Sequence, residues 1–190
     1  GLGTAIDVAL QADGKALLTG FAPLSASEAM VVRINAAGAL DATFNDAVSP
    51  VAGVAAFGLD CAGNAFPGGM AAAPTGGVYI AYGGGCSNGN LTLARMDATG
   101  QIDGAFSGGT SPGISNFFFP GNATSSRAVA VQADGFVVAG GSVNAAATRD
   151  FALVRVNPSG VPDAGFGSGG KVVFSPTAGA DELYALAVQP

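Results

Sequence analysis

The sequence contains no histidine and no tryptophan among its 190 residues. Without histidine the chain lacks the commonest general base, the usual zinc ligand and every Ser-His-Asp or Cys-His arrangement. Charged residues make up only 11% of the chain, and seven Lys and Arg against thirteen Asp and Glu give a net charge of -6. We therefore expect no basic surface that would bind nucleic acid or an anionic membrane.

Long hydrophobic runs are also absent. The apolar runs at residues 16–18 and 117–119 are far too short to span a bilayer, and the first residues lack the basic, apolar and small-residue order of a signal peptide. We expect no membrane insertion. The low lysine content and the abundance of Gly, Ala, Ser and Thr favour an exported protein, so the expected location is extracellular or at the cell surface.

Glycine is abundant, with 31 residues, which is typical of a chain with many tight turns. The sequence repeats itself with a period of about sixty residues. A first element recurs at residues 8–20, 70–83 and 129–140 and begins again at 186–190. Asp13-Gly14 and Asp134-Gly135 at its centre are dipeptides that two-residue hairpins favour, and Thr75-Gly76-Gly77 holds the same place in the second copy. Each copy therefore opens with a predicted β-hairpin.

A second element recurs at residues 30–44, 91–106 and 151–166. Each copy places an arginine on a strand that is apolar on both faces, with an aspartate eight residues later and a phenylalanine three residues after that. Such a strand needs cover on both faces, and a buried guanidinium needs a partner. The sequence therefore predicts structural pairs between the arginines and aspartates of each repeat, namely Arg33 with Asp41, Arg95 with Asp103 and Arg155 with Asp163.

A further apolar run at residues 171–174 supplies a fourth strand in the third copy, and four strands per repeat is the count of a propeller blade. The predicted fold is all-β, with tandem four-stranded repeats of about sixty residues in a β-propeller-like arrangement of three blades plus one strand of a fourth. Residues 1–190 form a single repeat array. Its approximate repeats are 5–66, 67–126 and 127–182, with a partial repeat at 183–190.

The sequence resembles the delta-60 repeat family, whose units carry a QPDGK-like hairpin followed by an F-A-L-V-R strand and a D-x-x-F-G pattern. The third copy matches best, through VAVQADGFVVAGG, DFALVRVNPSG and DAGFGSGGKVV. The second copy departs from the pattern, with Ala73, Thr75 and Asp97 at positions where the family has Gln, Asp and Asn. The resemblance implies a β-propeller-like repeat of large bacterial surface or secreted proteins, with no established activity.

Three blades do not make a usual ring, since propellers have about four to eight. We therefore expect the partners to be other copies of the chain or further repeats of a longer parent. Protein or carbohydrate ligands are additional candidates, and nucleic acid is not.

Cys61 and Cys86 are the only cysteines, and neither has a counterpart in the other repeats. They form a disulfide, or they are two reduced, buried thiols. The repeated aspartates suggest calcium, but one carboxylate per repeat offers too few ligands, and an arginine partner explains the constant spacing. We expect no metal and no cofactor.

The longest departures from the repeat lie at residues 51–67 and 107–126. The second contains Phe117-Phe118-Phe119, which is either an exposed contact patch or the fourth strand of a blade. The primary expectation is a non-catalytic structural or interaction module of a secreted or surface bacterial protein. A carbohydrate- or peptide-binding propeller is the alternative. A hydrolase or lyase would need clustered carboxylates, for which Asp60, Asp181 and Glu182 are the candidates.

Overall fold

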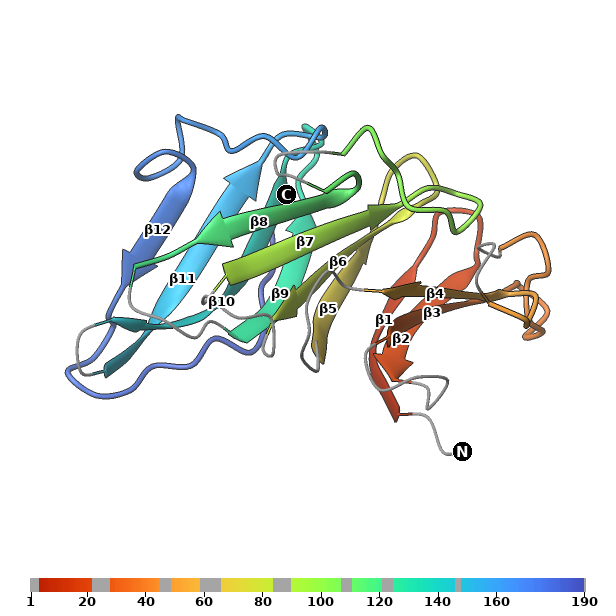
Figure 1. Ribbon diagram of the computed structural model, residues 1–190, viewed down its shortest axis with the longest axis horizontal. Coiled ribbons are helices and arrows are strands. Elements are labelled where there is room, and N and C mark those ends of the chain that lie inside the picture. Colours follow the sequence, from red (N-terminus) through yellow and green to blue (C-terminus); the bar gives the residue numbers. More distant parts are fainter. Residues whose placement is uncertain are drawn as a thin grey trace.

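The computed structural model describes residues 4–21, 28–44, 49–58, 66–83, 90–106, 111–120, 125–145 and 148–189. Within these ranges the strands form three antiparallel sheets of four strands each, and no helix is present. The strands of each sheet follow one another in chain order, and the three sheets fan out side by side without closing into a ring (Figure 1). The predicted all-β, propeller-like fold of four-stranded repeats is thereby confirmed.

Each sheet corresponds to one repeat of the sequence. Sheet 1 consists of β1 (Thr4–Leu10), β2 (Ala16–Phe21), β3 (Glu28–Ile34) and β4 (Val54–Gly58). Sheet 2 consists of β5 (Phe66–Ala72), β6 (Val78–Gly83), β7 (Asn90–Met96) and β8 (Ile114–Phe118). Sheet 3 consists of β9 (Ser125–Val131), β10 (Val137–Ala145), β11 (Thr148–Val156) and β12 (Lys171–Phe174).

The first hairpin of each sheet turns where the sequence predicts it. Gly14, Gly76 and Gly135 all have positive φ, at 80°, 91° and 85°. A residue with a side chain adopts that backbone conformation only with strain, which is why glycine recurs at this position. The turns set the register of each hairpin and gather at one end of the three sheets.

A β-bulge interrupts the first strand of every sheet at the same position of the repeat. The ladder shifts between Ala5 and Asp7, between Pro67 and Gly69, and opposite Gly140 and Gly141, so that Ile6, Gly68 and Arg127 are skipped. A bulge bends the strand and increases its twist. At Gly68 the bend brings β5 so close to β9 that an added Cβ would lie 1.9 Å from the carbonyl oxygen of Ser126.

The core consists of two apolar layers, one between sheets 1 and 2 and one between sheets 2 and 3. Sheet 2 contributes to both layers, and every residue of β6 is buried. The arginine-bearing strand β7 has residues in both layers, as expected for a strand that is apolar on both faces. At roughly 1.5–3 kcal/mol for each large apolar side chain removed from water, the two layers are the main source of stability.

Residues 183–189, which the sequence places as the first strand of a fourth repeat, lie against sheet 3. The amide of Leu183 donates to the Ser142 hydroxyl, and the Leu183 side chain lies over Gly140. The segment pairs with no strand of the described residues. In Figure 1 it is the dark blue trace that returns towards the middle of the fan.

Candidate functional site

Arg33 joins two blades. Its Nε lies 2.9 Å from Oδ2 of Asp41, and its Nη2 donates to the Thr43 hydroxyl, also at 2.9 Å. The third nitrogen, Nη1, donates across the blade boundary to the carbonyl oxygen of Ala98, at 2.6 Å. The arginine is 3% exposed and the aspartate 7%, so this charge pair is withdrawn from water, and each guanidinium nitrogen donates one hydrogen bond.

Arg95 repeats the arrangement between sheets 2 and 3. Its Nε lies 3.2 Å from Oδ2 of Asp103, and its Nη1 donates at 3.2 Å to the carbonyl of Pro158. Pro158 holds the same place in its repeat as Ala98. The sequence predicted the aspartate within the repeat but not the acceptor in the next one, because a backbone carbonyl has no residue signature.

Arg155 forms the third pair, with Nε 2.6 Å from Oδ2 of Asp163. No hydrogen bond from this arginine to a following turn occurs within the described part of the chain. The exposed fraction of the arginine side chain rises along the chain, from 4% for Arg33 to 16% for Arg95 and 28% for Arg155. The third pair, which no further sheet covers among the described residues, is thus the most accessible of the three.

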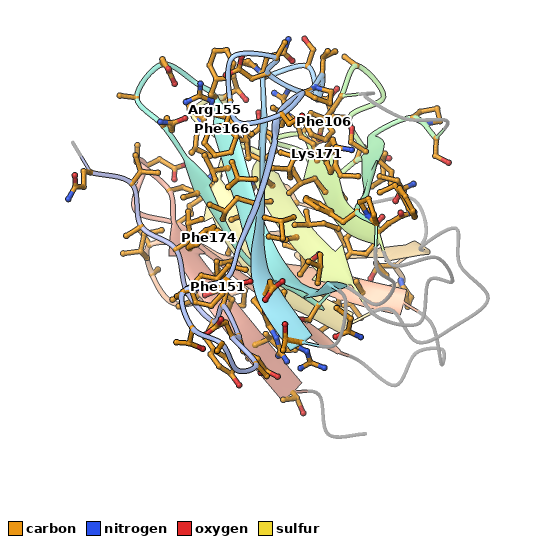
Figure 2. The ribbon with its side chains drawn as sticks, turned by 90° about the vertical axis from the view of Figure 1, so that its left-hand side faces the viewer. Phe106, Phe151, Arg155, Phe166, Lys171 and Phe174 are labelled. Atoms are coloured by element: carbon orange, nitrogen blue, oxygen red, sulfur yellow. The ribbon has the colours of Figure 1, made fainter. Side chains whose placement is uncertain are left out.

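Aromatic rings cover the three guanidinium groups. The centroid of the Phe44 ring lies 4.6 Å from Cζ of Arg33, that of Tyr79 lies 5.4 Å from Arg95, and that of Phe166 lies 4.8 Å from Arg155. Figure 2 shows Arg155 beside Phe166 at one end of the sheet 3 face. Each cation is thus held between a carboxylate and a ring, an arrangement that adds to the stability of the packed end.

Asp41 has a pKa well below the usual aspartate value. The main cause is the hydrogen bond from the Thr43 hydroxyl, and contacts with the cations of Lys15 and Arg33 add to it. Lys15 lies 3.3 Å from Asp41 and 3.1 Å from Asp13. The Asp41 carboxylate is therefore charged in the folded protein and serves as an anchor for two cations.

Two further contacts join sheets 1 and 2 near their first strands. The carboxamide of Gln11 donates from Nε2 to the carbonyl of Gly76, and the amide of Met70 donates to Oδ2 of Asp7 at 2.8 Å. Like the contact of Arg33 with Ala98, each links residues about one repeat apart along the sequence. Of these contacts, the arginine–carbonyl bond recurs between sheets 2 and 3, and the other two are specific to sheets 1 and 2 within the described residues.

A cavity of about 1030 Å³ opens at the end where the hairpin turns gather. Its walls come from the turns of all three sheets and from the C-terminal segment, including Gln11, Ala73, Gln132 and Gln189. These four residues hold the same position in successive repeats. The Oε1 atoms of Gln11 and Gln132 are buried and have no hydrogen-bond partner among the described residues. The cavity lining therefore combines polar with apolar side chains, while these two oxygen atoms lie beneath its surface.

The remaining predicted features have different outcomes. Cys61, Cys86 and Asp60 lie outside the described residues. Phe117 and Phe119 are buried and Phe118 is 55% exposed, since the run lies at the end of the fourth strand β8.

The candidate carboxylates Asp181 and Glu182 are engaged within the chain. Asp181 accepts hydrogen bonds from Thr177, and Glu182 bonds to Arg149 and Tyr184. In the described ranges no three His, Cys, Asp or Glu side chains group as metal ligands would, and no helix is long and apolar enough to cross a membrane.

Comparison with known proteins gives a fold without an activity. Residues 132–166 match the model of a family described as a domain of unknown function (DUF5122) beta-propeller. The chain is also similar to a solved protein of unknown function from Bacteroides caccae, at 13% identity and a TM-score of 0.52. That match covers 98% of this chain and 50% of the other, so the chain spans half the length of that protein. No curated protein matches.

Both findings agree with the propeller-like repeat family that the sequence resembles. The family model falls on the third repeat, which carries the resemblance most fully, and includes both Arg155 and Asp163. At 13% identity the likeness to the solved structure shows the fold alone.

Proposed function

We propose that this chain is a non-catalytic structural or interaction module of a secreted or surface bacterial protein. The observation that carries the proposal is the use of the repeated charged residues. Arg33 and Arg95 each bind an aspartate of their own blade and a carbonyl of the next blade, so these side chains hold the array together. Polar groups engaged in this way are not available for chemistry on a substrate.

The composition supports the secreted or surface location. A net charge of -6 with few lysines suits a protein that meets neither nucleic acid nor an anionic membrane. The resemblance to repeats of large bacterial surface proteins points the same way. In such a protein the array would act as a rigid spacer whose loops and end faces contact other molecules.

Protease treatment of intact cells tests the location. In the native bacterium, an epitope-tagged protein should be recovered in the surface or secreted fraction and should be cleaved by protease added to whole cells. A cytoplasmic protein in the same cells serves as the control for lysis. Recovery of the tagged protein in the cytoplasm, protected until the cells are broken, would contradict the proposal.

A second candidate function is the binding of a carbohydrate or a peptide in the cavity. The cavity itself favours it, because it gathers polar side chains from equivalent positions of successive repeats beside apolar residues, as ligand-binding pockets do. Calorimetric titration with neutral oligosaccharides and short peptides tests this function. Gln132→Leu should weaken any binding at least tenfold, whereas Gln101→Leu, outside the cavity, should not. Heats at the level of buffer dilution for the whole panel would exclude it.

A further inference from the structure

The cavity at the turn end has room for an occupant of several linked units. Its volume of about 1030 Å³ lies at the top of the range of roughly 300–1,000 Å³ that pockets for small ligands span. The part of the lining that sheets 2 and 3 contribute includes small apolar residues, namely Ala72, Ala73, Pro74, Val131 and Ala133. A short peptide or an oligosaccharide therefore fits the space better than a single small molecule does.

The lining favours a peptide over a sugar. Among the described residues that line the cavity there is no aromatic side chain. An aromatic ring is the flat apolar surface that would cover the face of a sugar ring over a large area. Small aliphatic side chains instead leave space into which the side chains of a bound peptide can reach. The chemistry of the lining thus fits a peptide chain.

At sheet 1 the charges of the cavity cancel. Lys15, which lines the cavity, lies 3.1 Å from Asp13 and 3.3 Å from Asp41. Arg33, a second lining residue, is paired with the same Asp41 at 2.9 Å. Two cations thus face two carboxylates, and this corner presents no net charge to a ligand.

Sheets 2 and 3 each add a carboxylate that no cation neutralises. Asp97 directly precedes the lining residues Ala98 and Thr99, and Asp134 directly follows Ala133. Neither carboxylate forms a salt bridge within the described part of the chain. In both, Oδ1 accepts backbone amides of its own turn, and no donor among the described residues bonds to Oδ2. The border of the cavity is therefore negative, with four carboxylates against two cations.

The fold does not need the charges of Asp97 and Asp134. Asn35 and Asn157 hold the position of Asp97 in the other repeats, and their side-chain oxygens accept the same pair of backbone amides, two and four residues later. Thr75 holds the position of Asp134 in sheet 2, where the following glycine still adopts the positive φ of the turn. Neutral side chains thus form both turns, so the two carboxylates are available to a ligand.

We propose that the cavity binds a cationic peptide segment of a partner protein. Lysine or arginine side chains of the segment would lie at Asp97 and Asp134, with short apolar side chains against the alanine and valine part of the lining. The net charge of -6 draws such a segment towards the chain, and the unneutralised carboxylates hold it in the cavity. This inference rests on the second candidate function and names the class of ligand that the same cavity takes.

Fluorescence anisotropy with three labelled octapeptides tests the proposal. The peptides alternate alanine with lysine, with glutamine or with glutamate. The lysine peptide should bind about tenfold more tightly than the glutamine peptide, since each charge contact near a surface adds a few-fold in affinity. The glutamate peptide should bind most weakly. Raising the salt concentration should remove most of the preference for lysine, because salt screens charges at the surface.

Asp97→Asn and Asp134→Asn should each weaken binding of the lysine peptide about threefold and leave binding of the glutamine peptide unchanged. Both substitutions keep the turn, because asparagine accepts the same amides at equivalent positions and suits a hairpin turn. Glu182→Gln is the matched control. It removes one negative charge beside Arg149, at the end of sheet 3 away from the cavity, and should not change the affinity.

Equal affinity for the lysine and glutamine peptides would overturn the assigned charge of the ligand and leave peptide binding by the cavity standing. A loss for Glu182→Gln as large as that for Asp97→Asn or Asp134→Asn would mean attraction to the acidic surface as a whole, and would overturn the assigned site. Binding by none of the peptides would overturn the inference. The second candidate function would then be decided by the oligosaccharides of the calorimetric panel, so the two failures are distinguishable.

Discussion

At the residue scale, the arginine of each repeat acts between blades as well as within one. Constant spacing from Asp41, Asp103 and Asp163 predicted a partner inside the repeat, and each aspartate lies within 3.2 Å of its arginine. The contacts with Ala98 and Pro158 had no counterpart in the prediction. They depend on how closely the next blade approaches, which only the packed structure reveals.

Arg33→Met should lower the free energy of unfolding by about 3 kcal/mol, the lower end of the range for breaking one partner of a buried pair. The lower end applies because Lys15 still contacts Asp41 after the substitution. Arg155→Met should cost less, since its pair is more exposed. Urea denaturation of the two variants measures both values, and an equal loss would contradict the ranking.

Asp41 should make the protein sensitive to acid. Its pKa is depressed in the folded state, so its contribution to stability is present above the unfolded aspartate pKa, about 3.9. That contribution is lost as the pH falls through the lower folded value. Asp41→Asn should therefore be less stable than the parent near neutral pH, with a difference that shrinks below about pH 4. Urea denaturation across that range tests this, and Asp134→Asn on an exposed turn is the control. A constant difference would contradict the assignment.

At the element scale, the strands and turns were largely predictable and the bulges were not. Alternating apolar residues and Asp-Gly or Gly-Gly turns fix a hairpin locally, through the φ that Gly14, Gly76 and Gly135 adopt. The bulges lie at Ile6, Gly68 and Arg127, which are three different residue types. No local sequence pattern therefore predicts where the bulges occur. The shared feature is their position relative to the neighbouring blade.

Gly69→Ala should destabilise the joint between sheets 2 and 3. An added Cβ at Gly69 would lie 2.7 Å from the carbonyl oxygen of Arg127 and 2.9 Å from Cα of Ala128. Backbone atoms cannot move aside cheaply, and overpacking of this kind costs about 1–3 kcal/mol. Gly104→Ala, whose Cβ would meet only Pro112 at 3.6 Å, is the matched control. Thermal unfolding compares them, and equal midpoints would contradict the close approach.

At the scale of the whole molecule, the repeat predicted three blades, and their stacking follows from strands that are apolar on both faces. The cavity at the turn end was not predicted. It arises where Gln11, Ala73, Gln132 and Gln189 converge from successive repeats, and their convergence depends on how the blades are stacked.

The central claim is that sheet 2 is sandwiched between two blades of the same kind, and amide hydrogen exchange tests it most directly. The second strands β2, β6 and β10 hold the same place in their repeats, and amides of β6 should exchange at least tenfold more slowly than those of β2 and β10, because local opening must break cover on both faces. Equal exchange in the three strands would contradict the stacked array.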